Sequence, residues 1–289
     1  MWGYVVSFIS LFSLAVFSFC LFLTDNISFF WLFLELGTLS LVPSFFLNSG
    51  DASLSSLFSY LVASALASAL FLCGALVEGF IFFLMLGLLL KFGVFPLYGW
   101  VYSVVLGSNW FVVWGLSTLL KSPFFLFSLL LGGEYIMLCS FLGGLTFISL
   151  AVLFWVFSFS WLHCWCHMML SSSAALVVMG LSQDTLLLVS LFAFYIFWSS
   201  LVIIFLSYLS SSETWQGNGF YFWFIFLLIS LPCSLSIFYK LLSGFCIYSC
   251  FLVVFCSWVI YSVSEQFFMI KYMVGLSSPR AQFDCYAGL

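Results

Sequence analysis

Long apolar segments separated by short polar stretches make up most of this chain. Each segment has about 18 to 27 residues, which is enough to cross roughly 30 Å of hydrocarbon as an α-helix. The pattern therefore predicts about ten transmembrane helices. Their expected ranges are 4–23, 27–47, 54–73, 80–105, 110–131, 135–157, 162–181, 185–209, 220–241 and 245–263.

The polar stretches between these segments contain residues that favour turns and helix caps. Gly, Asn, Asp and Ser are common at such positions. They occur at 24–26, 48–51, 107–109, 132–134 and 182–184, and the longest polar stretch is 210–219. Since none of these stretches could hold a soluble domain, we expect residues 1–289 to form a single transmembrane domain.

The C-terminal region departs from the pattern. Ser264 and Glu265 resemble the start of a helix, and Lys271 interrupts an apolar stretch that is too short to span the membrane upright. We therefore expect the spans to lie within residues 1–263, followed at 264–289 by an interfacial or short helix and a tail. An eleventh, tilted span is the alternative.

The composition supports an all-α, polytopic transmembrane bundle. Hydrophobic residues make up 66% of the chain and charged residues 5%, with a mean hydropathy of +1.32. A soluble domain carries about 25% charged residues, so membrane lipids are the expected surroundings. The net charge of −4 and the absence of a Lys/Arg cluster argue against a nucleic-acid partner.

Four charged residues lie inside apolar segments: Glu35, Lys91, Lys121 and Lys240. A charge near the centre of a bilayer costs from about 3 to more than 10 kcal/mol, depending on the method of estimate. Buried ionisable residues in membrane proteins commonly line paths for ions or protons. We therefore expect these four residues to form a proton relay.

A proline accompanies each of these charges along the sequence. The four are Pro43, Pro96, Pro123 and Pro232. Proline removes a backbone hydrogen bond from a helix and clashes with the preceding turn. We expect true helix breaks near Pro96 and Pro232, which is typical of antiporter-like transporters, and only kinks at Pro43 and Pro123.

The charges also have structural interpretations. Glu35 could be a carboxyl that only forms hydrogen bonds. Lys91 and Lys240 could extend their ammonium groups to the membrane surface. For Lys240 this alternative has more weight, because the residue lies near the end of a predicted span. The other acidic residues fall at span edges or in loops and are expected to be solvated or to cap helices, with an inward-facing Glu78 as the alternative: Asp51, Glu78, Glu134, Asp184 and Glu213.

A stretch at residues 162–170, LHCWCHMML, holds two histidines and two cysteines. Residues four apart share one face of a helix, so His163 and His167 point the same way while Cys164 and Cys166 point elsewhere. No four-ligand metal site is therefore expected here. We interpret the stretch as a polar helix start and His167 as a further candidate for the relay.

Three stretches resemble the family of NADH:ubiquinone oxidoreductase chain 2, the antiporter-like membrane subunit of respiratory complex I. Residues 31–43, WLFLELGTLSLVP, resemble a family stretch with glutamate and proline eight residues apart. Residues 91–100, KFGVFPLYGW, and 231–240, LPCSLSIFYK, are similar to two further lysine–proline motifs. Lys121 matches the family's third lysine, and the resemblance covers roughly residues 25–245.

The resemblance implies a role for each charge. Glu35 and Lys91 would form an ion pair, Lys121 would be the connecting lysine of the proton-translocating unit, and Lys240 would be the lysine of the second broken helix. The chain would be a subunit of the H+-translocating NADH:ubiquinone reductase and would translocate protons without redox chemistry of its own. NADH, FMN, iron–sulfur clusters and ubiquinone are then expected in other subunits, with no cofactor in this chain.

The same resemblance implies a setting and partners. The chain would lie in the mitochondrial inner membrane beside other membrane-arm subunits, including neighbouring antiporter-like ones. The sequence departs from the family pattern in two motifs: a loop carboxylate usual after Trp100 is missing, and His167 stands where a lysine is usual. A shortened C-terminal end suggests a compact invertebrate form.

Three functions fit these observations. A proton-translocating complex I subunit is the leading interpretation. An autonomous cation/proton antiporter is the alternative, because buried charges and broken helices also serve secondary carriers. A purely structural membrane-arm subunit with vestigial charges is the third.

Overall fold

The structure, a computed structural model, describes residues 2–24, 26–47, 50–77, 79–126, 135–211 and 218–277. All its elements are helices, so the predicted all-α fold is confirmed for these residues. The elements are α1 (Trp2–Phe22), α2 (Ile27–Phe45), α3 (Asp51–Leu76), α4 (Ile81–Phe92), α5 (Gly99–Gly107), α6 (Trp110–Ser117), the 3-10 helix η1 (Leu119–Phe125), α8 (Ile136–Val156), α9 (Trp161–Gly180), α10 (Thr185–Ser211), α11 (Asn218–Leu228), α12 (Leu235–Tyr248) and α13 (Leu252–Ser277).

Seven of these helices are long and apolar enough to cross a membrane: α1, α2, α3, α8, α9, α10 and α13. The shorter helices follow one another in pairs, α4 with α5, α6 with η1, and α11 with α12. Each pair occupies one predicted span as a broken helix. The seven long helices and the three pairs thus correspond in order to the ten predicted segments.

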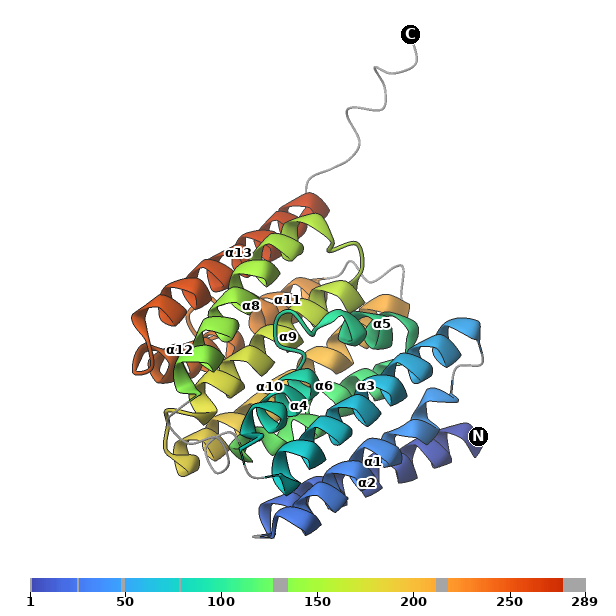
Figure 1. The fold of residues 1–289 in the computed structure, drawn as a ribbon. Helices are drawn as coiled ribbons and strands as arrows, with labels where there is room; N and C mark the ends of the chain where they lie inside the picture. Colours follow the sequence, from blue (N-terminus) through green and yellow to red (C-terminus); the bar gives the residue numbers. More distant parts are fainter. Residues whose placement is uncertain are drawn as a thin grey trace.

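The helices pack as a bundle around α9. Helices α1 and α2 lie at one side of the bundle and α12 and α13 at the other (Figure 1). Helix α9 lies between them and contacts α4, α5, η1, α8, α10 and α12. Because 89% of its spanning window is buried inside the protein, α9 is the core helix. The hydroxyls of Ser171, Ser172 and Ser173 donate to carbonyls one turn back, which satisfies these buried polar groups.

The break between α4 and α5 begins at Gly93. This residue has a left-handed φ of +64°, and the N–H of Val94 donates to the carbonyl of Leu89 at 3.1 Å, as in a Schellman helix end. Pro96, which follows a cis peptide bond, lies in the loop after this end. The predicted break near Pro96 is thus confirmed, but glycine rather than proline ends the helix.

The break between α11 and α12 contains Pro232, as predicted. Helix α11 ends at Leu228 and α12 begins at Leu235, with Ser234 accepting a capping hydrogen bond from the N–H of Ile237. Helix α12 continues to Tyr248, beyond the predicted end of this span at residue 241. Lys240 therefore lies inside a helix and not at its end.

The expected kink at Pro123 was wrong, because the α-helix stops before it. Helix α6 ends at Ser117, and the chain continues as η1, which contains both Lys121 and Pro123. Thr118 caps α6 by donating its hydroxyl to the carbonyl of Trp114, and Pro123 has no N–H with which to resume α-helical bonding. Pro43, by contrast, lies inside the continuous helix α2.

Helix α13 differs from the predicted C-terminal region. Residues Ser264 and Glu265 were expected to start an interfacial helix, but they lie in the middle of one continuous helix. Its buried face follows a spacing of three and four residues, which is one helical stripe: Val254, Ser257, Tyr261, Glu265 and Met269. Of the acidic residues placed at span edges, Glu78, Glu134 and Glu213 lie outside the described residues.

We expect Gly93→Ala to lower the melting temperature of the detergent-solubilised protein. An added Cβ would lie 2.7 Å from Cγ2 of Val101, and a left-handed residue other than glycine costs about 1–2 kcal/mol. Gly99→Ala is the matched control, because a Cβ there meets nothing within 4 Å. Equal melting temperatures for the two variants in scanning fluorimetry would contradict this account.

Candidate functional site

The first charged cluster joins α2, α3 and α4. Lys91 Nζ lies 3.2 Å from Glu35 Oε1, and the two side chains are 13% and 23% exposed. The hydroxyl of Ser68 on α3 donates to the same carboxylate oxygen. The structure thus brings Glu35 and Lys91 together as a mostly buried ion pair that a third helix supports.

The helix end at Gly93 positions Lys91. The carbonyl of Leu90 lies in the last turn of α4, and it accepts a 3.0 Å hydrogen bond from Nε1 of Trp100 on α5. Backbone groups in a membrane need such partners, because lipid provides none. Lys91 therefore sits at a helix end that backbone hydrogen bonds from Gly93 and Val94 close and that Trp100 ties to the next helix.

The second cluster surrounds Lys121, which is 4% exposed. Its Nζ donates to Met169 O at 2.7 Å, Ser172 Oγ at 2.6 Å and Tyr195 Oη at 3.0 Å. An ammonium has three N–H donors, so these acceptors use all of them. Among the described residues no carboxylate pairs with Lys121. Unlike Lys91, this lysine is held only by neutral groups.

The tyrosine of this cluster links it to the neighbouring elements. Tyr195 Oη donates to the carbonyl of Ser117 at the end of α6, which α-helical bonding no longer uses. Its ring lies 5.6 Å from the ring of Tyr239, the residue before Lys240, and Tyr239 stacks on Trp198 at 4.9 Å. Aromatic packing therefore connects the surroundings of Lys121 to α12.

A cavity of about 50 Å³ connects the first two clusters, because both Lys91 and Lys121 line it. A water molecule needs about 10–15 Å³ of such volume, so the cavity has room for on the order of three waters. Several polar side chains also line it: Thr38, Tyr60, Ser64, Trp100, Ser122 and Ser173. The site can therefore hold a short water chain between the two lysines.

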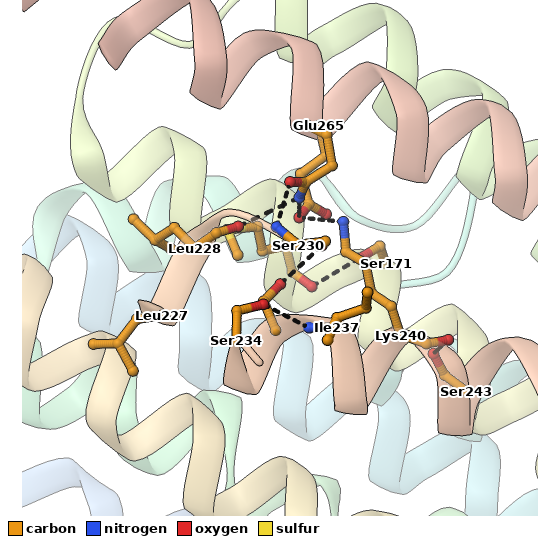
Figure 2. A network of polar contacts seen from close by, with 12 residues as sticks. Ser171, Leu227, Leu228, Ser230, Ser234, Ile237, Lys240, Ser243 and Glu265 are labelled. Atoms are coloured by element: carbon orange, nitrogen blue, oxygen red, sulfur yellow. Dashed lines mark hydrogen bonds and ion pairs between the residues drawn. The ribbon is translucent and has the colours of Figure 1, made fainter. Parts of the chain in front are cut away.

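The third cluster pairs Lys240 on α12 with Glu265 on α13. Lys240 Nζ lies 2.9 Å from Glu265 Oε1, and the side chains are 14% and 5% exposed. Figure 2 shows the two side chains pointing toward one another beside the break between α11 and α12. Burial in this ion pair argues against the interpretation that Lys240 reaches to the membrane surface.

Sequence analysis missed Glu265, because Ser264-Glu265 was interpreted as the start of a helix. The signal that could have identified it is the spacing of residues on α13. Tyr261, Glu265 and Met269 lie four residues apart and share one buried face. A carboxylate in such an apolar stripe needs a cationic partner, and Lys240 was already a candidate.

His167 lies apart from these three clusters. It is fully buried in the second turn of α9, which begins at Trp161, so the predicted helix start in this stretch is confirmed, and its Nδ1 lies 2.6 Å from the hydroxyl of Tyr102 on α5. Within the described residues, its Nε2 has no hydrogen-bond partner, and no ion pair or hydrogen bond joins it to the four charges. Ser160 caps the start of this helix by accepting from the N–H of His163.

The comparisons with known proteins agree with the motifs. NADH-ubiquinone oxidoreductase chain 2 of Artemia franciscana is 30% identical over 133 residues, which are 45% of this chain and 44% of that protein. The predicted resemblance is therefore confirmed by a protein that carries this name. The chain thus matches less than half the length of this relative. No protein-family model matches the chain.

The fold is shared with a solved assembly. A chain of respiratory complex I from Thermus thermophilus, in a structure with bound aureothin, superposes with a TM-score of 0.73 and 18% sequence identity. The match covers 89% of this chain and 67% of that one. The predicted antiporter-like bundle is thus the fold of a complex I membrane chain.

We expect Lys91→Met to destabilise the protein more than the double change Glu35→Gln with Lys91→Met. The single change leaves the Glu35 carboxylate buried without its cation, whereas the double change leaves a neutral pair. Thermal or denaturant unfolding in detergent should give a coupling free energy of about 0.5–3 kcal/mol. Additive effects of the two single changes would contradict a real ion pair.

Proposed function

We propose that this chain is a membrane-arm subunit of respiratory complex I and translocates protons through Glu35, Lys91, Lys121 and Lys240. The observation that carries the proposal is the environment of Lys121. This lysine is buried, has only neutral acceptors among the described residues, and lines the same cavity as Lys91, the partner of Glu35. A purely structural role would not require an unpaired charge in such a costly position.

Proton transfer between the first two lysines is the central step. A proton that leaves the Lys91 ammonium through cavity water breaks one N–H bond there and forms one at a neutral Lys121 amine. Positive charge then moves one cluster further while the total charge is unchanged. The paired Glu35 carboxylate attracts the proton back toward Lys91, so this transfer is reversible and responds to changes in the pair.

The neutral acceptors around Lys121 make it suitable for this step. A carboxylate at 3 Å would stabilise the ammonium strongly in a low-dielectric interior. Carbonyl and hydroxyl oxygens orient the amine and stabilise its charge less, so the proton can leave again. The hydroxyls of Tyr195 and Ser172 both accept from and donate to neighbours, which allows them to exchange protons with Lys121.

His167 is proposed as a branch of this relay, because its Nδ1 contacts the Tyr102 hydroxyl in the core helix. We further infer that the partners are other membrane-arm subunits, including antiporter-like ones, in the mitochondrial inner membrane. NADH, FMN, iron–sulfur clusters and ubiquinone would then be bound by those and other subunits. The name of the Artemia relative supports this assignment over an autonomous antiporter.

Lys121→Met in the assembled complex should reduce proton translocation by about tenfold or more, as expected when a proton-transferring group is removed. The acceptors keep other partners, because Ser172 also donates to Met169 O and Tyr195 to Ser117 O. Lys271→Met is the matched control, since this lysine is exposed over the ring of Trp155. The measurement is proton uptake per NADH oxidised in proteoliposomes.

Normal proton translocation by an assembled Lys121→Met complex would overturn the proposal. Loss of translocation in the Lys271→Met control would instead point to a general effect of losing any lysine from the chain.

The endogenous chain should migrate with NADH dehydrogenase activity on a blue-native gel, because the proposal makes it one subunit of a large assembly. The isolated chain has a mass of 32.7 kDa. A band near this mass, without NADH dehydrogenase activity and with ion exchange in liposomes, would favour the autonomous antiporter instead.

A further inference from the structure

We propose that Glu265 is a proton-carrying residue, and that Lys240 and Glu265 form a second exchange pair at the opposite side of the bundle from Glu35 and Lys91. The inference deepens the proposed function and rests on it. Glu265 would then do more than neutralise a buried lysine. Four features of the structure support this role.

The first feature is the cost of the position that Glu265 occupies. It lies on the buried face of α13, and its side chain is 5% exposed. Removing a carboxylate from water costs several kcal/mol even after relaxation of the protein. An apolar residue of similar size would pack on this face without that cost. A purely structural explanation must therefore identify something that only a carboxylate can do here.

The second feature is the contact with Lys240. The distance of 2.9 Å between Nζ and Oε1 is within the range for direct proton transfer. In the transfer an N–H bond of the ammonium breaks and an O–H bond of the carboxyl forms, giving a neutral amine and a neutral acid. The pair has no net charge before or after, so the step requires no counter-ion.

The third feature is the way in which the helix break is connected to Glu265. The amide of Gln266, the next residue, accepts from Ser230 N at 2.8 Å and donates to Leu228 O at 3.3 Å and to Glu265 Oε1 at 3.2 Å. Two of these groups belong to the backbone at the end of α11 and in the break that follows it (Figure 2). Any rearrangement of the break would therefore act on the carboxylate and on its distance from Lys240.

The fourth feature is the hydroxyls around the pair. Tyr261 lies one turn before Glu265 on the same buried face of α13, and its hydroxyl lies beside the side chains of Glu265 and Ser171. Tyr239, next to Lys240, packs against Tyr195 of the Lys121 cluster. The carboxylate is thus placed beside a hydroxyl that can pass a proton, and ring packing joins the pair to the Lys121 cluster.

A lock between α12 and α13 is the competing role for Glu265. Such a lock would need the ion pair for stability and assembly but not for transport. The two roles predict different transport for a variant that keeps the shape of the Glu265 side chain but lacks its titratable carboxyl. They also differ in whether a carboxyl changes its protonation during turnover.

The test uses the assembled complex in proteoliposomes, with proton uptake per NADH oxidised as the readout. Glu265→Gln keeps the shape and removes the titratable group, and Glu265→Asp keeps the group. We expect a loss of about tenfold or more for Glu265→Gln and partial retention for Glu265→Asp. Infrared difference spectra during turnover should contain a carboxyl C=O band that Glu265→Gln removes.

Ser264→Ala is the matched structural control. It removes the hydrogen bonds between α13 and α8, from Ser264 Oγ to Ala151 O and from Trp155 Nε1 to Ser264 Oγ, and keeps the Lys240–Glu265 pair. We expect it to lower the yield of assembled complex while proton uptake per assembled complex changes less than twofold. An equal loss of uptake per complex in Ser264→Ala and Glu265→Gln would favour the lock and overturn the inference.

Each remaining outcome separates the inference from the proposed function. If Glu265→Gln translocates like the unchanged protein while Lys121→Met does not, the inference fails and the proposed function stands. If both variants translocate normally, both fail. Should Glu265→Gln not assemble, the charge exchange of Lys240→Glu with Glu265→Lys decides: restored assembly with restored transport supports an exchange pair, and restored assembly without transport indicates a lock.

Discussion

The need to give every buried charge a partner in a medium that cannot hydrate it determines how this bundle is built. Lys91 and Lys240 each face a carboxylate from another helix, and Lys121 uses a carbonyl and two hydroxyls. In each case the partners come from other helices. The charges therefore constrain which helices can be neighbours, in addition to the apolar packing that would hold any hydrophobic bundle together.

Broken helices create a second need, because their ends release backbone groups that lipid cannot satisfy. Long side chains from other helices provide the partners. Trp100 reaches Leu90 O, Tyr195 reaches Ser117 O, and Gln266 reaches Leu228 O at the end of α11 and Ser230 N in the break that follows. Each break is thus tied to a neighbouring helix, so a change at one break is transmitted by hydrogen bonds to a charged cluster.

Much of this arrangement could be predicted from the sequence, because span length and buried charge are strong local signals. The ten segments, the four charges and the breaks near Pro96 and Pro232 all follow from them. What could not be predicted depends on contacts in space or on backbone conformation. Gly93 ends α4 through a left-handed residue, and η1 depends on the cap at Thr118. Glu265 was misassigned, because Ser-Glu is an ordinary helix start unless the cation that it meets is known.

The three buried lysines differ in the kind of partner that holds them, and this difference shows more about the site than the positions of the charges alone. Paired lysines lie toward both sides of the bundle, and between them Lys121 has only neutral acceptors. A proton on either outer lysine is held by a carboxylate, whereas a proton on Lys121 is held by weaker dipoles. In the proposed relay the central position is therefore the one where charge is least favoured, and it would act as the barrier between two wells. Loosening either outer pair would raise the energy of that well, so an event at one side of the bundle would send a proton toward the other.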